Sequence, residues 1–304
     1  MNGDNRCTRR AFAKGILAST ALLHTSFKSQ EKNERFDLMK EVFRFKKLDA
    51  YTTSVFTPAS IALHLDYADR FGVSKMFVAN PMTQIKLTPD EFREHNNKVI
   101  AAVKQHPDRF VGQFTVNPMY RRESLDEIDR CLDAGMMGTR LYQQVKINDP
   151  VYAPILEKLA SLNILIFMHG ECQMGVGGYK MKYDVKKVPT ISTPDDFVDV
   201  AQRYPEAMFQ FAHIGGGSDW ECMCKTFEPY PKIYVDTGGS NNEEYMIDFA
   251  LKHLGEDRLL FGSDNSLYQS IGKIFASELT DSQKEKLFYK NYKRILNKGG
   301  FHVD

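Results

Sequence analysis

Short apolar runs alternate with amphipathic stretches along almost all of this 304-residue chain. The runs have the length of buried strands, and the stretches carry apolar residues at helical spacing. The expected strands are residues 44–51, 73–80, 110–116, 138–142, 164–168, 208–212, 232–236 and 258–261. The expected helices are residues 58–71, 89–106, 124–134, 150–162, 195–204, 219–227, 242–254 and 283–296. This alternation, with no linker inside it, predicts that residues 35–304 form one α/β domain, a (β/α)8 TIM barrel, rather than an open doubly wound sheet.

The composition excludes several other classes of protein. Hydrophobic residues make up 42% of the chain and charged residues 26%, which is typical of a globular protein. The formal net charge of +1 gives no basis for binding nucleic acid. The five cysteines have no repeated CxxC spacing, and their odd number argues against a disulfide scaffold.

The N-terminal residues have the pattern of an export signal. Residues 8–14 (TRRAFAK) are basic, and the uncharged stretch at residues 15–27 follows them. A basic region before a short apolar region is typical of a secretory signal. The paired Arg9 and Arg10, followed by Phe and Lys, indicate the twin-arginine type. We expect residues 1–30 to be read by the export machinery and the protein to be periplasmic or otherwise exported; the alternative is an amphipathic or disordered tail.

Three of the expected strands end in side chains that can bind metal or transfer protons. Strand five ends in FMHGE, which contains His169 and Glu171, strand six ends at His213, and strand eight is followed by Asp264. The C-terminal ends of barrel strands meet at one face, where active sites lie. Imidazole and carboxylate groups are ligands for a divalent metal that activates water. Taken alone, each histidine could instead be a structural residue with no role in catalysis. Asp264 could also be a general base or the N-cap of the next helix.

Further polar side chains are expected to reach the same face. Arg140 follows strand four and can hold a substrate carboxylate with two hydrogen bonds, although a surface ion pair is the alternative. Tyr142, close to Arg140, and Asn265, which follows Asp264, are weaker candidates for binding substrate.

Six motifs in order resemble the amidohydrolase-related family, in the branch that contains aminocarboxymuconate-semialdehyde decarboxylase. They are HPDRFVGQFTVNP, MGTRLY, FMHGE, YPEAMFQFAHIGGG, IYVDTGG and EDRLLFGSDNS. The resemblance implies a metal-dependent barrel in which His169 and Asp264 are metal ligands. It implies that His213 lies beside the metal and activates or orients water or substrate. The implied cofactor is a divalent metal, with zinc expected.

The first strand departs from the pattern of this family. Members end that strand in Asp-x-His-x-His, and both histidines bind the metal, whereas this chain has Tyr51 and Thr53 at those positions. Tyrosine and threonine hold their protons at neutral pH and are poor zinc ligands. Two arrangements stay open. His169, His213 and Asp264 bind a metal with help from Glu171 or Cys172, or they act as acid–base groups on a reactive ester or lactone. Tyr51 is then expected to contact the substrate.

These observations lead to three functional expectations. The first is an exported hydrolase of the amidohydrolase type that attacks a C–O or C–N bond of a small, carboxylate-bearing molecule. In it Asp264 is a ligand or base, His169 is a ligand or acid, and His213 stabilises the oxyanion. The second is a non-oxidative decarboxylase, and the third is a barrel without catalysis that serves as a binding protein. The resemblance also implies a homodimer, although the sequence contains no interface signal.

Overall fold

The computed structural model describes residues 37–53, 56–80, 86–173 and 188–303. Contacts divide the chain into two compact units, Met1–Glu41 and Val42–Asp304. In the first unit the described part is the beginning of helix α2 (Leu38–Phe43). The predicted export signal at residues 1–30 lies outside the described residues. Within the four described ranges, no helix has both the length and the apolar character needed to cross a bilayer.

Eight parallel strands form the centre of the Val42–Asp304 unit. They are β1 (Lys47–Thr53), β2 (Val73–Ala79), β3 (Phe110–Phe114), β4 (Gly138–Thr139), β5 (Ile166–His169), β6 (Phe209–Ala212), β7 (Ile233–Asp236) and β8 (Leu259–Leu260). They pair in chain order as two sheets, β1 to β4 and β5 to β8. The strands therefore follow one another around the unit in the order of the sequence.

Backbone hydrogen bonds join the two sheets at both seams. Leu141, just after β4, donates its N–H to the carbonyl of Phe167 in β5 at 2.8 Å. At the other seam, Ala50 in β1 donates to the carbonyl of Phe261, just after β8, also at 2.8 Å. The sheet thus closes on itself, and the predicted (β/α)8 barrel is confirmed.

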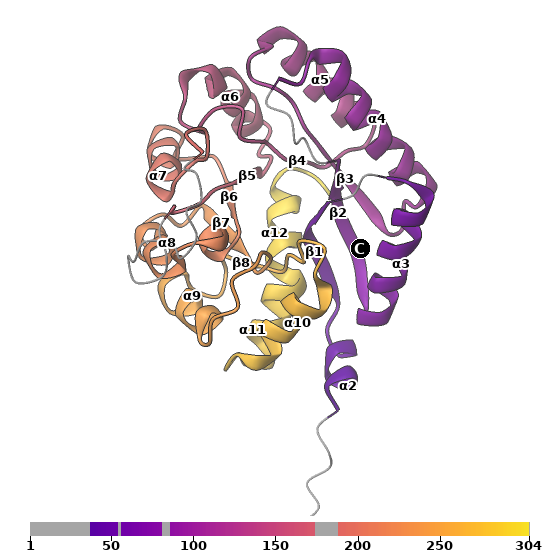
Figure 1. Ribbon diagram of the computed structural model, residues 1–304, viewed down its shortest axis with the longest axis vertical. Coiled ribbons are helices and arrows are strands. Elements are labelled where there is room, and N and C mark those ends of the chain that lie inside the picture. Colours follow the sequence, from indigo (N-terminus) through magenta and orange to yellow (C-terminus); the bar gives the residue numbers. More distant parts are fainter. Residues whose placement is uncertain (1–36, 54–55, 81–85, 174–187, 304) are drawn as a thin grey trace, which may run out of the picture. The chain divides into compact units, whose positions relative to one another are not determined.

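Helices surround the strands in this unit (Figure 1). They are α3 (Pro58–Phe71), α4 (Pro89–Gln105), α5 (Arg121–Asp133), α6 (Ala153–Ser161), α7 (Pro194–Arg203), α8 (Trp220–Phe227), α9 (Met246–Leu254), α10 (Leu267–Ala276), α11 (Asp281–Glu285) and α12 (Asn291–Lys298). Shorter turns are η2 (Pro150–Tyr152), η4 (Ile214–Gly217) and the π-helical η5 (Lys286–Lys290). The predicted helices are present, although the C-terminal one is divided into α11, η5 and α12. Helix α10 was not predicted.

Threonine followed by proline begins three of the outer helices, α3, α4 and α7. Proline in the first turn costs no hydrogen bond, because that N–H has no partner within the helix. At α3, Thr57 Oγ1 accepts from the N–H of Ser60 at 3.2 Å, and Ser60 Oγ accepts from the N–H of Thr57 at 3.0 Å. This reciprocal capping fixes where the chain leaves the barrel and the helix begins.

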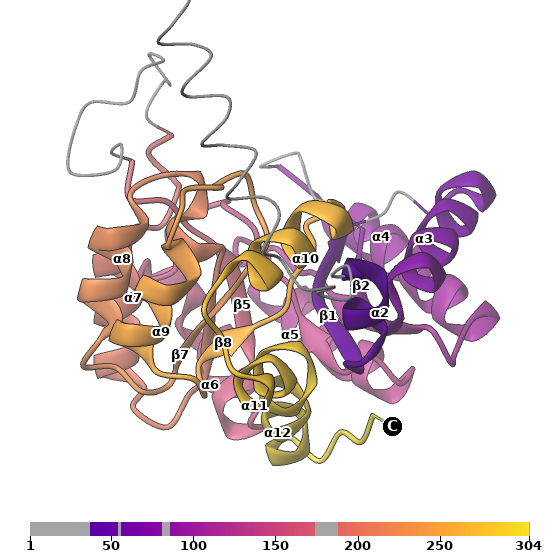
Figure 2. The same ribbon diagram turned by 90° about the horizontal axis from the view of Figure 1, so that it is seen from below.

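Helix α12 covers the N-terminal end of the barrel. Its buried Tyr292, Ile295 and Leu296 belong to one apolar cluster with residues near the beginning of the strands, such as Leu48 and Leu165. Figure 2 shows α11 and α12 together at one end of the barrel strands. Because apolar side chains fill this end, the opposite end, where the strands finish, is left for a site.

Candidate active site

A cavity of about 350 Å³ lies where the barrel strands end. Its walls come from the ends of β1, β5, β6 and β8 and from the loop after β7. The lining residues are Tyr51, His169, Glu171, His213, Gly216, Gly217, Gly239, Ser240 and Asp264. All four residues predicted as metal ligands or acid–base groups, and also Tyr51, therefore come together.

Three side chains form a line from the buried interior into this cavity. Nδ1 of His213 lies 2.5 Å from Oδ1 of Asp236, and Nε2 of His213 lies 3.5 Å from Oδ2 of Asp264. The side chains of Asp236 and His213 are 0% and 4% exposed, whereas that of Asp264 is 38% exposed. The imidazole is thus held on one side by a buried carboxylate and faces an accessible carboxylate on the other.

The buried pair of His213 and Asp236 favours the charged form of each residue. Burial alone would lower the pKa of His213, but the charge of Asp236 and its hydrogen bond outweigh burial and raise the pKa. Burial likewise acts to raise the pKa of Asp236. The charge of His213 and hydrogen bonds from His213, from Gln210 at 2.9 Å and from the N–H of Gly238 at 3.0 Å outweigh this effect and lower the pKa. His213 therefore holds its proton at Nε2 over a wider pH range than a free histidine.

Two glycines after β7 pack directly against the imidazole of His213. A Cβ atom added to Gly238 would lie 2.7 Å from Nδ1, and one added to Gly239 would lie 2.7 Å from Cδ2. Gly239 also has a φ of +76°, in the left-handed region that favours glycine. No side chain larger than hydrogen fits at either position without moving the imidazole.

The ring of Tyr51 covers the guanidinium of Arg140. The Arg140 Cζ atom lies 4.0 Å from the Tyr51 ring centroid and 5.0 Å from that of Phe167. The Tyr51 ring also packs against Phe167 and against His213, with centroid distances of 5.0 Å and 4.5 Å. The stack places a permanent cation beneath one wall of the cavity.

Asp49 ties the first strand to the last one. Its side chain is fully buried and accepts hydrogen bonds from Thr52 Oγ1 at 2.6 Å, from the N–H of Ser263 at 2.9 Å and from the N–H of Tyr51 at 3.1 Å. Burial raises the pKa of Asp49 to about 6, although the hydrogen bonds act in the opposite direction. Asp49 thus positions two residues of the cavity wall. It holds Tyr51 directly, and it holds Asp264 through the adjacent Ser263.

His169 and Glu171 form a second polar pair in the wall. Nε2 of His169 lies 3.2 Å from Oε1 of Glu171, and both side chains are 26% exposed. The centroid of the His169 ring is 5.9 Å from that of His213. The two imidazoles therefore face the same small volume without touching each other.

The other predicted substrate-binding residues do not line the cavity. Arg140 is 1% exposed, and its guanidinium donates to the carbonyl of Thr52 and to Oε1 of Gln113. Tyr142 packs beside a small apolar cluster. Asn265 is exposed, and its Oδ1 lies 3.3 Å from Nε2 of His64.

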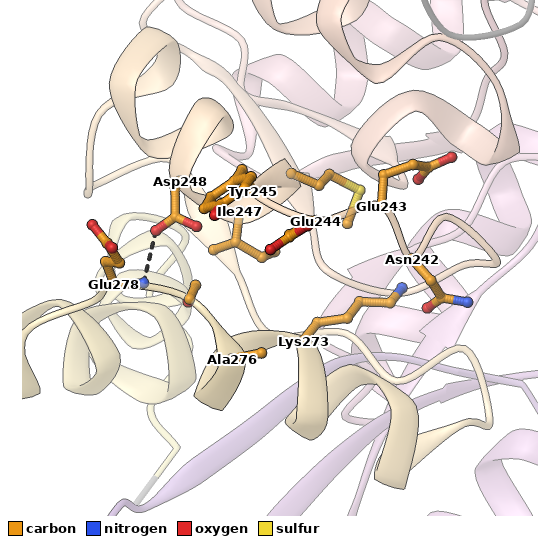
Figure 3. A pocket seen from close by; sticks show the side chains of 11 residues that line it. Asn242, Glu243, Glu244, Tyr245, Ile247, Asp248, Lys273, Ala276 and Glu278 are labelled. Carbon is orange, nitrogen blue, oxygen red and sulfur yellow. Dashed lines mark hydrogen bonds between the residues drawn. The ribbon is translucent and has the colours of Figure 1, made fainter. Parts of the chain in front are cut away.

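Lys273, on the unpredicted helix α10, supports the site from behind. Its ammonium donates to the carbonyls of Gly239 at 2.9 Å and Thr237 at 3.4 Å. Burial lowers its pKa to about 8. Figure 3 shows the side chain extending toward Asn242 along a second cavity, of about 430 Å³, on the other side of the loop at residues 237–245. Lys273 thus holds the glycine loop that packs on His213.

Sequence reasoning missed Asp236 and Lys273. Asp236 ends β7 and so had the same positional signal as the three predicted strand-end residues. Lys273 had no such signal, because it lies on a helix and not at the end of a strand.

The donor atoms do not form a metal centre. In the described part of the chain, no three side chains of His, Cys, Asp or Glu lie close enough together to hold a metal ion. The cavity walls contain two histidines and two carboxylates, but these are arranged as two separate pairs, His169 with Glu171 and His213 with Asp264.

Comparison with known proteins finds similarity to several decarboxylases. It is 23% identical over 220 residues to 2-amino-3-carboxymuconate-6-semialdehyde decarboxylase of Dictyostelium discoideum, a match that spans 62% of this chain and only 60% of that protein. Among solved structures it is similar to 2,6-dihydroxybenzoate decarboxylase from Rhizobium, with a TM-score of 0.65, 16% identity and coverage of 84% of this chain and 98% of the other.

Two further solved structures show the same fold. One is 5-carboxyvanillate decarboxylase from Sphingomonas paucimobilis, with a TM-score of 0.65, 14% identity and coverage of 83% and 99%. The other is a dihydroxybenzoic acid decarboxylase from Polaromonas with bound manganese, with a TM-score of 0.64, 14% identity and coverage of 83% and 96%. Manganese, rather than the predicted zinc, is thus the metal named in such a structure.

A family model described as amidohydrolase matches residues 71–298, which include seven of the eight strands and the site residues His169, His213, Asp236 and Asp264. The chain therefore belongs to the amidohydrolase family of TIM-barrel proteins, as the sequence motifs indicated.

Proposed function

We propose that this chain is a non-oxidative decarboxylase that acts on a small, unsaturated carboxylate. Hydrolysis of a C–O or C–N bond, the first expectation from the sequence, is wrong: the relatives with a named activity are decarboxylases, which break a carbon–carbon bond. The relatives named here act on small carboxylates, in agreement with the expected class of substrate. The observation that carries the proposal is the position of His213 in the cavity wall, where buried Asp236 holds one side of its imidazole and the other side faces Asp264.

Decarboxylation of an unsaturated acid needs a proton at the carbon that bears the carboxylate. In the proposed reaction, Nε2–H of His213 gives its proton to that carbon, and the bond to the carboxylate then breaks. Its electron pair returns to the conjugated system, and carbon dioxide leaves. His213 regains a proton from solvent, and Asp236 keeps the ring in one orientation and stabilises its charged form. A positioned acid of this kind contributes about 10²–10⁴-fold to the rate.

The remaining residues of the cavity orient the substrate. The carboxylates of Asp264 and Glu171 repel the substrate carboxylate, so this group lies toward His169 and the hydroxyl of Tyr51. Asp264 accepts a hydrogen bond from a substrate hydroxyl or amine and thus holds the reacting carbon over Nε2 of His213. Arg140 acts through Tyr51, which it supports from below, because a direct contact with substrate would require the Tyr51 ring to move.

Manganese is bound in a solved relative, but the donor set in the described part of this chain does not fit a divalent metal. No step of the proposed reaction is therefore routed through a metal, whether manganese or the predicted zinc.

The reaction is tested with the substrates named for the relatives, 2,6-dihydroxybenzoate and 5-carboxyvanillate, and with related phenolic and unsaturated acids. We expect release of carbon dioxide and a product that lacks the carboxyl group, and we expect His213→Gln to abolish both. A folded protein that binds these acids without converting any of them would instead support the third expectation, a barrel that only binds.

Export through a twin-arginine signal is also proposed, from Arg9 and Arg10. Conversion of both to lysine should keep the protein in the cytoplasm, and unchanged export would contradict this route. A homodimer remains a prediction from the family resemblance, and the molecular mass in solution tests it.

A further inference from the structure

Tyr51 fills the first of the two positions at which members of this family place metal-binding histidines, and its ring is fixed by its surroundings. Arg140, His213 and Phe167 each pack against it, at 4.0, 4.5 and 5.0 Å. A phenol oxygen holds its proton at neutral pH, unlike the imidazole nitrogen of a histidine, and is a poor metal ligand.

The charge beside this position also disfavours a metal ion. A divalent cation bound next to Tyr51 would lie close to the buried guanidinium of Arg140, which never loses its charge. Two positive charges in a poorly solvated interior repel each other more strongly than they do in water. At the position where other members have a metal-binding histidine, this chain therefore has the ring of Tyr51, which packs on the guanidinium of Arg140.

The carboxylates and imidazoles of the cavity are engaged with each other instead. His213 lies between Asp236 and Asp264, and His169 is paired with Glu171. Within the described ranges these groups do not converge on one point.

On this basis we infer that the enzyme works without a divalent metal, with the neutral hydroxyl of Tyr51 as a hydrogen-bond donor to a substrate oxygen. The fixed positive charge beneath that wall belongs to Arg140. This inference rests on the proposed decarboxylation for the role of Tyr51, but its statement about metal binding does not depend on turnover.

Metal content is measured first, on the full chain produced with manganese and zinc in the medium and purified without chelators. We expect far less than one equivalent per chain, no rise in melting temperature when either ion is added, and turnover that a chelator leaves unchanged. A ligand present at about 100 times its Kd would stabilise the fold by about 2.7 kcal/mol, so binding would be visible in the melting temperature. Nearly one metal per chain, lost in His169→Ala, would overturn the inference.

A variant designed to gain a metal site tests whether the residues of the first strand are the reason that the chain binds no metal. Tyr51→His combined with Thr53→His restores both family donors, and this double variant should acquire manganese or zinc while the wild-type chain does not. Tyr51→His alone serves as a second variant in case the double one does not fold, and it should bind more weakly than a folded double variant. If the double variant folds and still binds no metal, Tyr51 and Thr53 are not the reason that the wild-type chain lacks a metal.

Tyr51→Phe separates the hydroxyl from the ring. It keeps the stack on Arg140 and should leave metal content unchanged while raising KM or lowering kcat about tenfold, the effect of one lost hydrogen bond to an anionic group. Unchanged kinetics in an active enzyme would refute the role of the hydroxyl. Absence of turnover in the wild-type chain would refute the proposed decarboxylation and leave the metal measurement standing.

Discussion

Nδ1 of His213 lies 2.5 Å from Oδ1 of Asp236, and the side chains of both residues are almost completely buried. This contact favours the protonated form of an imidazole at the edge of a cavity that also contains the carboxylates of Asp264 and Glu171. The charge of Asp264 acts in the same direction as that of Asp236, and the charge of Lys273 acts against both.

Asp236→Asn should move the alkaline limb of the pH profile to lower pH. The limb reports loss of the His213 proton, and Asp236 is what raises the pKa of His213. Without the anion the pKa falls, so activity is lost at a lower pH than in the wild-type chain. Profiles of kcat/KM, together with NMR titration of His213, check this. The control Asp66→Asn removes a carboxylate from a surface pair with Arg70 and should leave the profile unchanged.

Gly239→Ala should reduce kcat about 10²-fold, because the new methyl group displaces the imidazole of His213 and small displacements of a catalytic group have effects of this size. Gly255→Ala is the matched control. Gly255 has the same φ of +76°, but a Cβ there would meet nothing within 4 Å. Both variants should lose stability in urea through the positive φ, Gly239→Ala somewhat more because of the clash, and only Gly239→Ala should lose activity. Equal activity in the two would show that Gly239 does not position His213.

Lys273→Met should raise KM and lower kcat while the fold persists. The ammonium holds the carbonyls of Gly239 and Thr237, and a hydrogen bond from a charged donor contributes about 1.5–3 kcal/mol. Lys252→Met, at an exposed position on α9, is the control. If Lys273→Arg has a kcat between those of Lys273→Met and the wild-type chain, the positive charge at this position is what supports the loop. Wild-type kinetics in Lys273→Met would contradict the positioning role.

Asp49→Asn should flatten the dependence of stability on pH between about 4 and 6. The folded protein raises the pKa of Asp49 from 3.8 to about 6, so it holds the proton more tightly than the unfolded chain does. The resulting stabilisation, of about 3 kcal/mol, is complete below the unfolded pKa and is lost as the pH rises through about 6. Urea unfolding across this range checks the difference between variant and wild type. The same slope in both would mean that Asp49 does not titrate in this way.

The barrel and the meeting of His169, His213 and Asp264 could be predicted from the sequence for one physical reason. Parallel strands are apolar runs that the pattern reveals, and their C-terminal ends meet at one face. The same reasoning would have included Asp236, had the end of β7 been treated like the others.

Other parts of the site depend on packing that the linear pattern does not contain. The stack of Tyr51 on Arg140 joins β1 to the end of β4 through the barrel interior. Helix α10 was not predicted, although Leu267, Ile271 and Ile274 lie at helical spacing and are buried. Lys273 was missed with it. The expectation of hydrolysis was wrong because a fold does not determine the reaction that its site carries out.

Protonation of the substrate carbon is tested most directly by running the reaction in deuterium oxide with 2,6-dihydroxybenzoate, 5-carboxyvanillate and related acids. Mass spectrometry and NMR then locate the deuterium. The proposal predicts carbon dioxide and a product with one deuterium at the carbon that carried the carboxylate, absent in His213→Gln. A product that retains its carboxyl group and carries an oxygen atom from solvent would contradict it.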